Sequence, residues 1–179
     1  MGKSTLAAFI FFFLAVQANA QIGAMKLVGP GTKDYSLGFG AFLKTGIPVS
    51  DGADATIEIG ADFFPDKDYP GDYGTVMCPL KLGYRYTLNG TGEGFYVEPQ
   101  AGFNLYGVTS TQDDYGHDVD LKYHGVVLAA GAGYLFPIGR TPFDVNLRYE
   151  TVIAHGGSNN IVSLGVSRTI SFGKRNSDY

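Results

Sequence analysis

Three scarcities narrow the classes of protein that this sequence can encode. Its 179 residues include one cysteine, Cys78, which excludes an intramolecular disulfide and a metal site built from cysteines. Lys and Arg number 13 against 17 Asp and Glu, and a nucleic-acid partner would require a basic patch. After the first 20 residues, no apolar run approaches the roughly 20 residues that a transmembrane helix needs. The sequence therefore predicts neither a nucleic-acid-binding protein nor a helical membrane protein.

The first 20 residues have the features of a secretory signal peptide. Lys3 precedes an apolar run over residues 6–16, and the segment ends in Ala18-Asn19-Ala20, a small-x-small cleavage pattern. The run is too short to span a bilayer as a helix. We expect residues 1–20 to be removed by cleavage near Ala20 and the remainder to form one domain.

Strict alternation of apolar and polar residues dominates the rest of the chain. Residues 95–106 read FYVEPQAGFNLY, with Phe95, Val97 and Phe103 on one face and Tyr96, Glu98 and Asn104 on the other. This period of two predicts a two-faced β-strand. The same pattern predicts strands over residues 35–43, 56–63, 76–88, 125–136, 143–153 and 162–172. Residues 22–28 are assigned as an eighth strand, because bacterial single-chain barrels close with even strand numbers.

The strands are long, and their connections fall into two kinds. Most strands span about 10–13 residues, which suits a tilted membrane crossing better than the roughly 5–6 residues of soluble strands. If the last strand ends in the periplasm, residues 89–94 and 137–142 become short periplasmic turns. Residues 65–74, 107–122 and 155–160 then form longer external loops. The linker over residues 44–55 is the exception, being long where a short turn is expected.

The polar face carries charges of both signs and many glycines. Inside a narrow barrel these charges can satisfy one another, and glycines make room for large neighbours. Pairing across the 89–94 hairpin, for example, sets Arg85 opposite Glu98. We therefore predict an interior polar network made of Lys44, Glu58, Asp62, Lys81, Arg85, Glu98, Asp144, Arg148 and Glu150.

Aromatic residues of the apolar face gather at one end of the strands. They are Tyr84, Tyr86, Phe95, Tyr134, Phe136, Phe143 and Phe172, all next to the assigned periplasmic edge. Such a girdle is typical of a lipid–water interface and favours lipid on the apolar face. A soluble periplasmic barrel that binds a lipid is an alternative, and it would need the apolar side chains inside and the glycine-rich face outside.

With its signal peptide, its alternating strands and a final strand IVSLGVSRTISF ending on Phe172, the chain resembles the small OmpA/OmpX-like outer-membrane β-barrels, particularly those of Bacteroidetes. The resemblance covers residues 21–172 and leaves 173–179 as a short polar tail. It implies an all-β fold, an eight-stranded antiparallel up-and-down transmembrane β-barrel. It also implies insertion into the cell outer membrane by the assembly machinery, and contact with outer-membrane lipid and lipopolysaccharide.

Three residues fit this pattern badly. Arg168 falls on the lipid face near the end of the last strand, unless a bulge turns it inward. Pro79 and Pro99 each remove a ladder hydrogen bond in a barrel that has no edge strand, so bulges or irregular pairing are expected there.

Few residues are candidates for transport, catalysis or cofactor binding. An eight-stranded barrel is only wide enough to be filled by its own side chains, so we expect a plugged interior and no pore. A lipid A acyltransferase or deacylase is the enzymatic alternative, since an ester substrate needs a nucleophile and a base. Its candidate residues are His117, His124, His155, Ser110, Ser158 and Glu150, but they match no deacylase pattern. We assign no catalytic residue and no cofactor.

Acidic loops are the remaining signal. Asp113, Asp114, Asp118 and Asp120 lie in one predicted external loop, and Asp66, Asp68 and Asp72 lie in another. Their spacing matches no calcium-loop motif, so no metal site is assigned. We predict a monomer with a structural role in the envelope, or an adhesion-like role through these loops toward a surface partner that the sequence does not identify.

Overall fold

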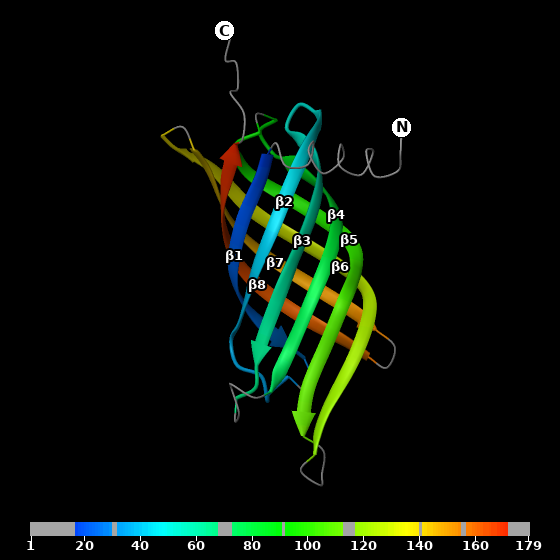
Figure 1. Ribbon diagram of the computed structural model, residues 1–179. Coiled ribbons are helices and arrows are strands. Elements are labelled where there is room, and N and C mark those ends of the chain that lie inside the picture. The colour runs from blue at the N-terminus through cyan, green and yellow to red at the C-terminus, as the bar shows by residue number, and fades with distance from the viewer. Residues whose placement is uncertain are drawn as a thin grey trace, which may run out of the picture.

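Eight antiparallel strands form a closed barrel in the computed structural model, which describes residues 17–29, 32–67, 73–90, 92–112, 117–139, 141–154 and 157–171. The strands are β1 (Gln17–Val28), β2 (Gly38–Ser50), β3 (Ala53–Pro65), β4 (Gly74–Thr87), β5 (Gly94–Gln112), β6 (Asp118–Ile138), β7 (Thr141–Ala154) and β8 (Gly157–Ser171). Each strand pairs with the next, and β1 pairs with β8 (Figure 1). None of the described residues belongs to a helix long and apolar enough to cross a membrane. The all-β, up-and-down barrel is confirmed.

The eighth strand assigned over residues 22–28 is present as part of β1. It pairs with β2 on one side and with β8 on the other, so it closes the sheet. β1 begins at Gln17, so cleavage after Ala20 would remove the first four residues of this strand. Cleavage at that position stays a prediction.

The strands continue through segments that were expected to be connections. The prediction of a long linker over residues 44–55 is wrong. β2 continues to Ser50 and β3 begins at Ala53, so only Asp51 and Gly52 form the turn. Gly52 has a φ of 71°, which glycine adopts without steric cost. The prediction of a loop over residues 107–122 is also wrong, since most of this segment belongs to β5 and β6. β8 begins at Gly157, inside the loop that was predicted over residues 155–160.

Two rims follow from this arrangement. We call the end with the β2–β3, β4–β5 and β6–β7 turns the turn rim, and the end with the other four connections the loop rim. β1 begins and β8 ends at the turn rim (Figure 1).

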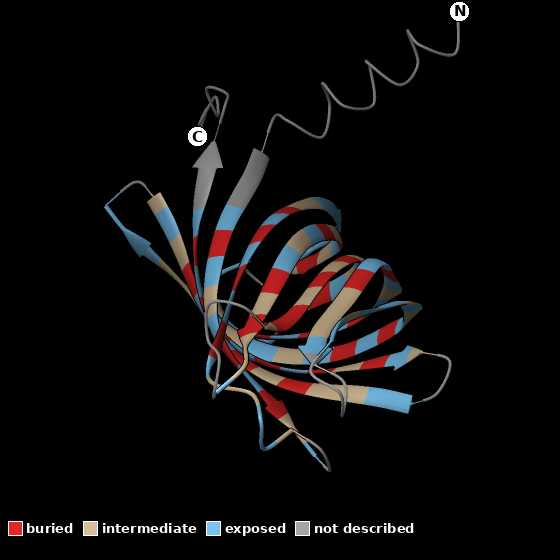
Figure 2. Ribbon diagram, turned by 60° about the horizontal axis from the view of Figure 1, so that its bottom comes forward, coloured by how far each residue is buried: buried red, intermediate tan, exposed pale blue. Residues whose placement is uncertain are grey.

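Burial alternates along the strands with polar residues inside. In β7, Asn146, Arg148 and Glu150 are buried, whereas Leu147 and Tyr149 between them are exposed. The buried and exposed bands alternate along the strands in Figure 2. Because neighbouring side chains of a strand point to opposite faces, the alternation in the sequence sets this pattern directly. The apolar face points outward, the reverse of what a soluble lipid-binding barrel requires.

A β-bulge in β5 changes which side chains face outward. Asn104 pairs with Pro79 and Gly125, while Tyr106 pairs with Cys78, so the register of β5 shifts by one residue against both neighbours. The extra residue lies in β5, opposite Pro79, where irregular pairing was expected. As a consequence Tyr106, predicted on the polar face, is exposed beside Leu105 on the outer face.

At Pro99 and Arg168 the register is unbroken. The β4–β5 ladder skips from the Gly83–Gln100 pair to the Tyr86–Val97 pair, so Pro99 interrupts pairing with β4 without a bulge. Arg168 pairs with Ala20 and Phe143 without a register shift, and its side chain is exposed. Arg168 therefore lies on the outer face, as the alternation predicts.

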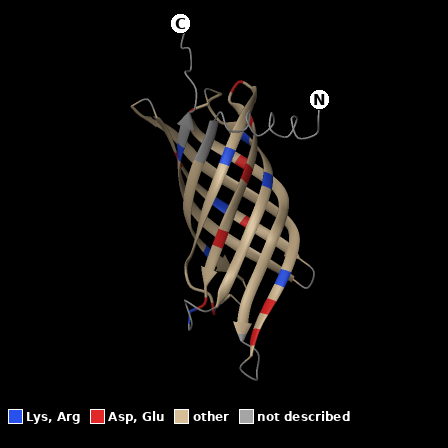
Figure 3. Ribbon diagram, viewed as in Figure 1, with Lys and Arg blue, Asp and Glu red and all other residues tan. Residues whose placement is uncertain are grey.

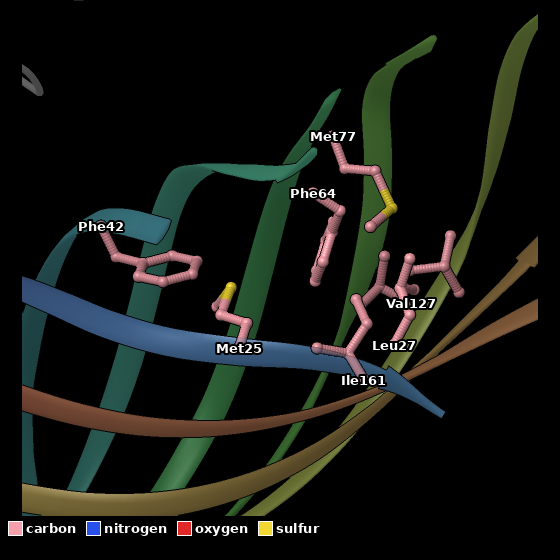
Figure 4. Close-up of a cluster of buried hydrophobic side chains, with 8 residues drawn as sticks. Met25, Leu27, Phe42, Phe64, Met77, Val127 and Ile161 are labelled. Carbon is pink, nitrogen blue, oxygen red and sulfur yellow. The ribbon is translucent and has the colours of Figure 1, made fainter. Parts of the chain in front are cut away.

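The core of the barrel also contains an apolar layer that the sequence reasoning missed. Near the loop rim, buried apolar side chains from six strands and from β2 point into the lumen (Figure 4). They are Met25, Leu27, Phe42, Phe64, Met77, Val127, Val152 and Ile161. Several of them occupy positions of the polar face, so the signal was present as apolar exceptions in the alternation. We call these eight residues the apolar layer.

Candidate functional site

The nine residues predicted to form the interior network are all buried. They come from β2, β3, β4, β5 and β7, and the charged positions on these strands are marked in Figure 3. Desolvating a charge is costly unless a partner of opposite sign and hydrogen bonds compensate it. The contacts of each carboxylate therefore determine how well its buried charge is compensated.

Glu58 has the most cationic partners. Its carboxylate accepts two hydrogen bonds from the Arg148 guanidinium, at 2.6 Å to Oε1 and 3.0 Å to Oε2. Lys81 Nζ lies 3.0 Å from Oε1, and Lys44 Nζ lies 3.7 Å from Oε2. Three cations from β2, β4 and β7 thus surround one fully buried carboxylate of β3, and the bidentate arginine fixes its orientation.

Glu98 forms a second centre closer to the turn rim. It accepts hydrogen bonds from Lys44 Nζ, from Thr56 Oγ1 at 2.7 Å and from Arg85 Nε at 3.3 Å. The contact between Arg85 and Glu98 is the one that the hairpin register predicts. Because Lys44 lies between Glu58 and Glu98, the two centres share a cation and form one network.

Asp144 extends the network across the barrel. Its carboxylate accepts a hydrogen bond from the Tyr96 hydroxyl at 2.8 Å, and Arg85 Nη2 lies 3.7 Å away. The ring of Tyr96 packs closely over Gly133, where an added Cβ would lie 2.6 Å from the hydroxyl oxygen. Gly133 therefore makes room for a large interior side chain, as expected for glycines of a small barrel.

Asp62 and Glu150 are less well compensated. Lys81 Nζ donates a hydrogen bond to Glu150 Oε2 at 2.5 Å, but Glu150 Oε1 has no hydrogen-bond partner among the described residues. Asp62 is buried with Oδ1 also unpartnered there. The structure thus brings eight of the nine predicted residues into ion pairs and leaves Asp62 beside them.

Two kinds of side chain consequently occupy the lumen. The ion-paired network fills its middle and the part toward the turn rim, and the apolar layer fills the part toward the loop rim. Arg148 and Lys81 join the two, since both cations lie over the ring of Phe42, at 5.4 Å and 5.1 Å from its centroid.

The predicted girdle forms a row of rings on the outer face near the turn rim. Phe95 of β5 lies edge-on to Tyr134 of β6 at 4.7 Å between centroids, and Phe136 stacks on Phe143 of β7 at 6.3 Å. Tyr84 and Tyr86 of β4 are exposed on the same face. Phe172 lies outside the described residues. That this row meets a lipid–water interface stays a prediction.

The candidate residues for an enzyme that the structure describes are not gathered into one site. Glu150 is buried in the lumen in its ion pair with Lys81, whereas Ser158 and His124 are exposed near the loop rim. Ser110 Oγ donates a hydrogen bond to Asp120 at 2.7 Å. His155 lies outside the described residues.

The acidic loops are described only in part. Asp68, Asp72, Asp113 and Asp114 lie outside the described residues. Within the part of the chain that is described, no three His, Cys, Asp or Glu residues are grouped to hold a metal ion.

The longest hairpin projects beyond its neighbours at the loop rim. β5 and β6 remain paired from Gly107 with Tyr123 out to Gln112 with Asp118. On the β4 side, pairing reaches Ser110, but on the β7 side it stops where Gly125 meets Ala154. In Figure 1 this hairpin extends furthest at the lower end of the barrel.

The barrel is similar in fold to solved structures of bacterial proteins. The N-terminal β-barrel domain of Pseudomonas aeruginosa OprF matches with a TM-score of 0.60 and 12% identity, over 87% of this chain and 98% of that chain. Neisserial surface protein A (NspA) matches with a TM-score of 0.58 and 13% identity, over 87% and 96%. Ail, the attachment invasion locus protein of Yersinia pestis, matches with a TM-score of 0.61 and 13% identity, over 86% and 98%.

These identities are low enough that the likeness shows the fold alone. No family model matches the chain, and no curated protein sequence is significantly similar to it. The fold implied by the resemblance to OmpA/OmpX-like barrels is confirmed, whereas the more specific likeness to Bacteroidetes barrels stays a prediction.

Proposed function

We propose that this chain is an outer-membrane β-barrel protein with a filled interior, which contacts lipid through its outer face and other surfaces through its loop rim. The observation that carries the proposal is the inverted burial. Charged residues such as Glu58 and Lys81 are fully buried, while Phe95, Leu147 and Leu82 are exposed by 66%, 57% and 63%. An apolar exterior on a closed barrel suits the hydrocarbon of a bilayer, where every backbone polar group must be satisfied internally.

The orientation follows from the lengths of the connections. Outer-membrane barrels have short periplasmic turns and longer external connections. The connections of the turn rim have two, six and two residues, and those of the loop rim have nine, eight, five and two, so the longest connections lie at the loop rim. The turn rim is then periplasmic, and the loop rim with the projecting β5–β6 hairpin is external. The barrel would be inserted by the outer-membrane assembly machinery and would contact lipopolysaccharide around the loop rim.

An interactive role for the loop rim agrees with what the similar structures are called. One is a surface protein, one is an attachment invasion locus protein, and the latter has also been solved in complex with the heparin analogue sucrose octasulfate. In this chain the described part of the loop rim exposes Lys33, Lys67 and Lys122 beside Asp34, Asp118 and Asp120, and such mixed charges suit a protein surface better than a ligand of one sign. We therefore infer contact with a protein surface and assign no enzymatic role.

Heat-modifiability tests the proposal directly. Folded membrane barrels resist SDS, because their hydrogen bonds close on themselves without an edge, so boiled and unboiled samples should migrate differently on a gel. We expect this shift, with the protein in the outer-membrane fraction. A soluble periplasmic protein without a shift would contradict the proposal.

A further inference from the structure

The projecting hairpin leaves one strand edge unpaired. Beyond Gly125, β6 continues for seven residues toward Asp118 with β5 as its partner, while β7 turns back into β8 after Ala154. Among the described residues, the backbone of Asp118–Tyr123 therefore has no ladder partner on its second side. We call this stretch the free edge. Unpaired N–H and C=O groups in a row form a template for one more strand.

The side chains of the free edge are self-complementary. If two copies pair antiparallel about Leu121, Asp120 of each copy lies opposite Lys122 of the other. Val119 then lies opposite Tyr123, and Leu121 lies opposite its own counterpart. One step further out, Asp118 would lie opposite His124. Directly opposite residues of an antiparallel pair interact most strongly, with opposite charges favourable and like charges unfavourable.

We propose that the free edge of β6 pairs with the free edge of a second copy of this chain, antiparallel and centred on Leu121. A second copy is the partner that fits this edge, because the same antiparallel register forms two Val119–Tyr123 pairs and two Asp120–Lys122 pairs. An edge that is only protected against aggregation typically carries charges that repel a partner strand. Here acidic and basic residues are instead placed at equal distances on either side of Leu121.

The charged side chains of this pairing and Leu121 at its centre are accessible, whereas Val119 and Tyr123 are half-buried. Leu121 is 56% exposed, and Asp120 and Lys122 are exposed on the outer side of the hairpin. Asp120 accepts a hydrogen bond from Ser110 of β5, and Asp118 accepts one from the Tyr73 hydroxyl at 2.5 Å. These bonds hold the two carboxylates in place, and a carboxylate can accept further hydrogen bonds from a partner.

The geometry of the pair sets where the second copy must be. Antiparallel pairing reverses the direction of the strand, and β6 runs from the loop rim to the turn rim. Two copies inserted in the same sense in one membrane cannot meet in this way, whereas copies in two apposed membranes can. This inference rests on the proposed function, which places the loop rim outside. The monomer expected from the sequence then describes the state within one membrane.

A short edge gives a weak individual contact. The surface area that one pair of free edges buries is much smaller than the roughly 1,200–2,000 Å² of a stable interface, so a single pair forms transiently. Many copies in two facing membranes raise the effective concentration of each further contact. Membrane-to-membrane clustering is accordingly the readout in which the pairing is expected to appear.

Charge exchange at the free edge provides the test. The full chain is reconstituted into phosphatidylcholine vesicles, and clustering is followed by light scattering. Asp120→Lys sets two lysines against two lysines in a self-pair, and Lys122→Asp sets two aspartates against two aspartates. Each variant alone should cluster about tenfold more slowly than the unaltered protein. Mixing vesicles of the two variants restores both opposite-charge pairs and should restore clustering.

The controls separate charge from position. Asp34→Lys and Lys33→Asp make the same two charge changes on exposed residues at the loop rim, away from the free edge, and should leave clustering unchanged. If the unaltered vesicles do not cluster, or if the mixed variants are no faster than each variant alone, the pairing is refuted. Clustering that depends equally on the control pair would assign it to general electrostatics and also refute the proposal.

A failure of the proposed function is recognised separately in the same samples. Protein that neither floats with the vesicles nor shifts on heating contradicts the membrane barrel. Clustering of beads that carry many copies of that protein, with the same single variants and their mixture, then tests the free edge alone, because self-pairing needs facing copies and no membrane. Clustering that is lost in each variant and recovered in the mixture would support the edge pairing, and beads of the unaltered protein that do not cluster would refute it.

Discussion

Buried carboxylates of this barrel differ in how well their neighbours compensate them. Glu58 has three cationic partners within 3.7 Å, whereas Asp62 Oδ1 has no hydrogen-bond partner among the described residues. Both side chains are almost completely buried. The same chemical change, from carboxylate to amide, should therefore have opposite consequences at the two positions.

We expect Glu58→Gln to lower the free energy of unfolding by about 3–5 kcal/mol, because it leaves Arg148, Lys81 and Lys44 as uncompensated buried cations. Asp62→Asn should be neutral or stabilising, because it removes a buried charge with an unpartnered oxygen. Urea unfolding of the barrel in lipid vesicles measures both, and each variant serves as the control of the other. Equal losses at the two sites would contradict this account of the network.

At the scale of strands, alternation was sufficient to predict most of the barrel. Because period two assigns every side chain to a face, the burial of Arg148 in β7 and the exposure of Arg168 in β8 both follow from the sequence. The nine predicted interior residues all lie in the lumen for the same reason.

The elements that the sequence did not predict depend on tertiary context. The bulge that turns Tyr106 outward results from the pairing of β5 with both β4 and β6, and the alternation within a single strand does not show such pairing. The 44–55 segment contains Gly46, Pro48 and Gly52, residues that usually mark a loop, yet pairing between β2 and β3 keeps most of it extended. The apolar exceptions Phe64 and Met77 could be interpreted only in the folded barrel, where five further strands contribute the other residues of the apolar layer.

The outer face of β7 offers a prediction that depends on the surrounding solvent. Leu147 lies midway along the strand and is 57% exposed, between Ala132 and Leu164 of the flanking strands. In a bilayer, Leu147→Arg should destabilise the barrel by about 2–4 kcal/mol, since a cation near the midplane is poorly solvated. Leu88→Arg, at the turn rim, should cost only about 0–1 kcal/mol.

Denaturant unfolding in vesicles distinguishes the two leucine variants. A face that meets water would tolerate both substitutions to within about 0.5 kcal/mol. A cost of Leu147→Arg no larger than that of Leu88→Arg would therefore place the outer face in water.

At the scale of the whole molecule, the filled lumen predicts that the barrel does not conduct. Glu58 and Lys81 are inaccessible to solvent, and the apolar layer containing Phe64 and Val127 closes the path toward the loop rim. An ion would have to break the network and then cross a layer without polar partners. In planar bilayers we expect conductance at the background level, and stable steps above it would contradict the plugged interior.

The pairing of β1 with β8 also has a consequence for biogenesis. Twelve residue pairs, from Gln17 with Ser171 to Val28 with Asn160, join the two strands that are furthest apart in the sequence, and the eight pairs from Gln21 with Ser167 onward would remain after cleavage at Ala20. Contacts between residues so far apart in the sequence form late, because the entropy cost of closing a long loop arises before the contacts stabilise the chain. A chain still emerging from the ribosome lacks its last strand, so every shorter fragment keeps two open edges. Completion of synthesis therefore has to come before closure, and until then the open edges of the chain are able to pair with other chains.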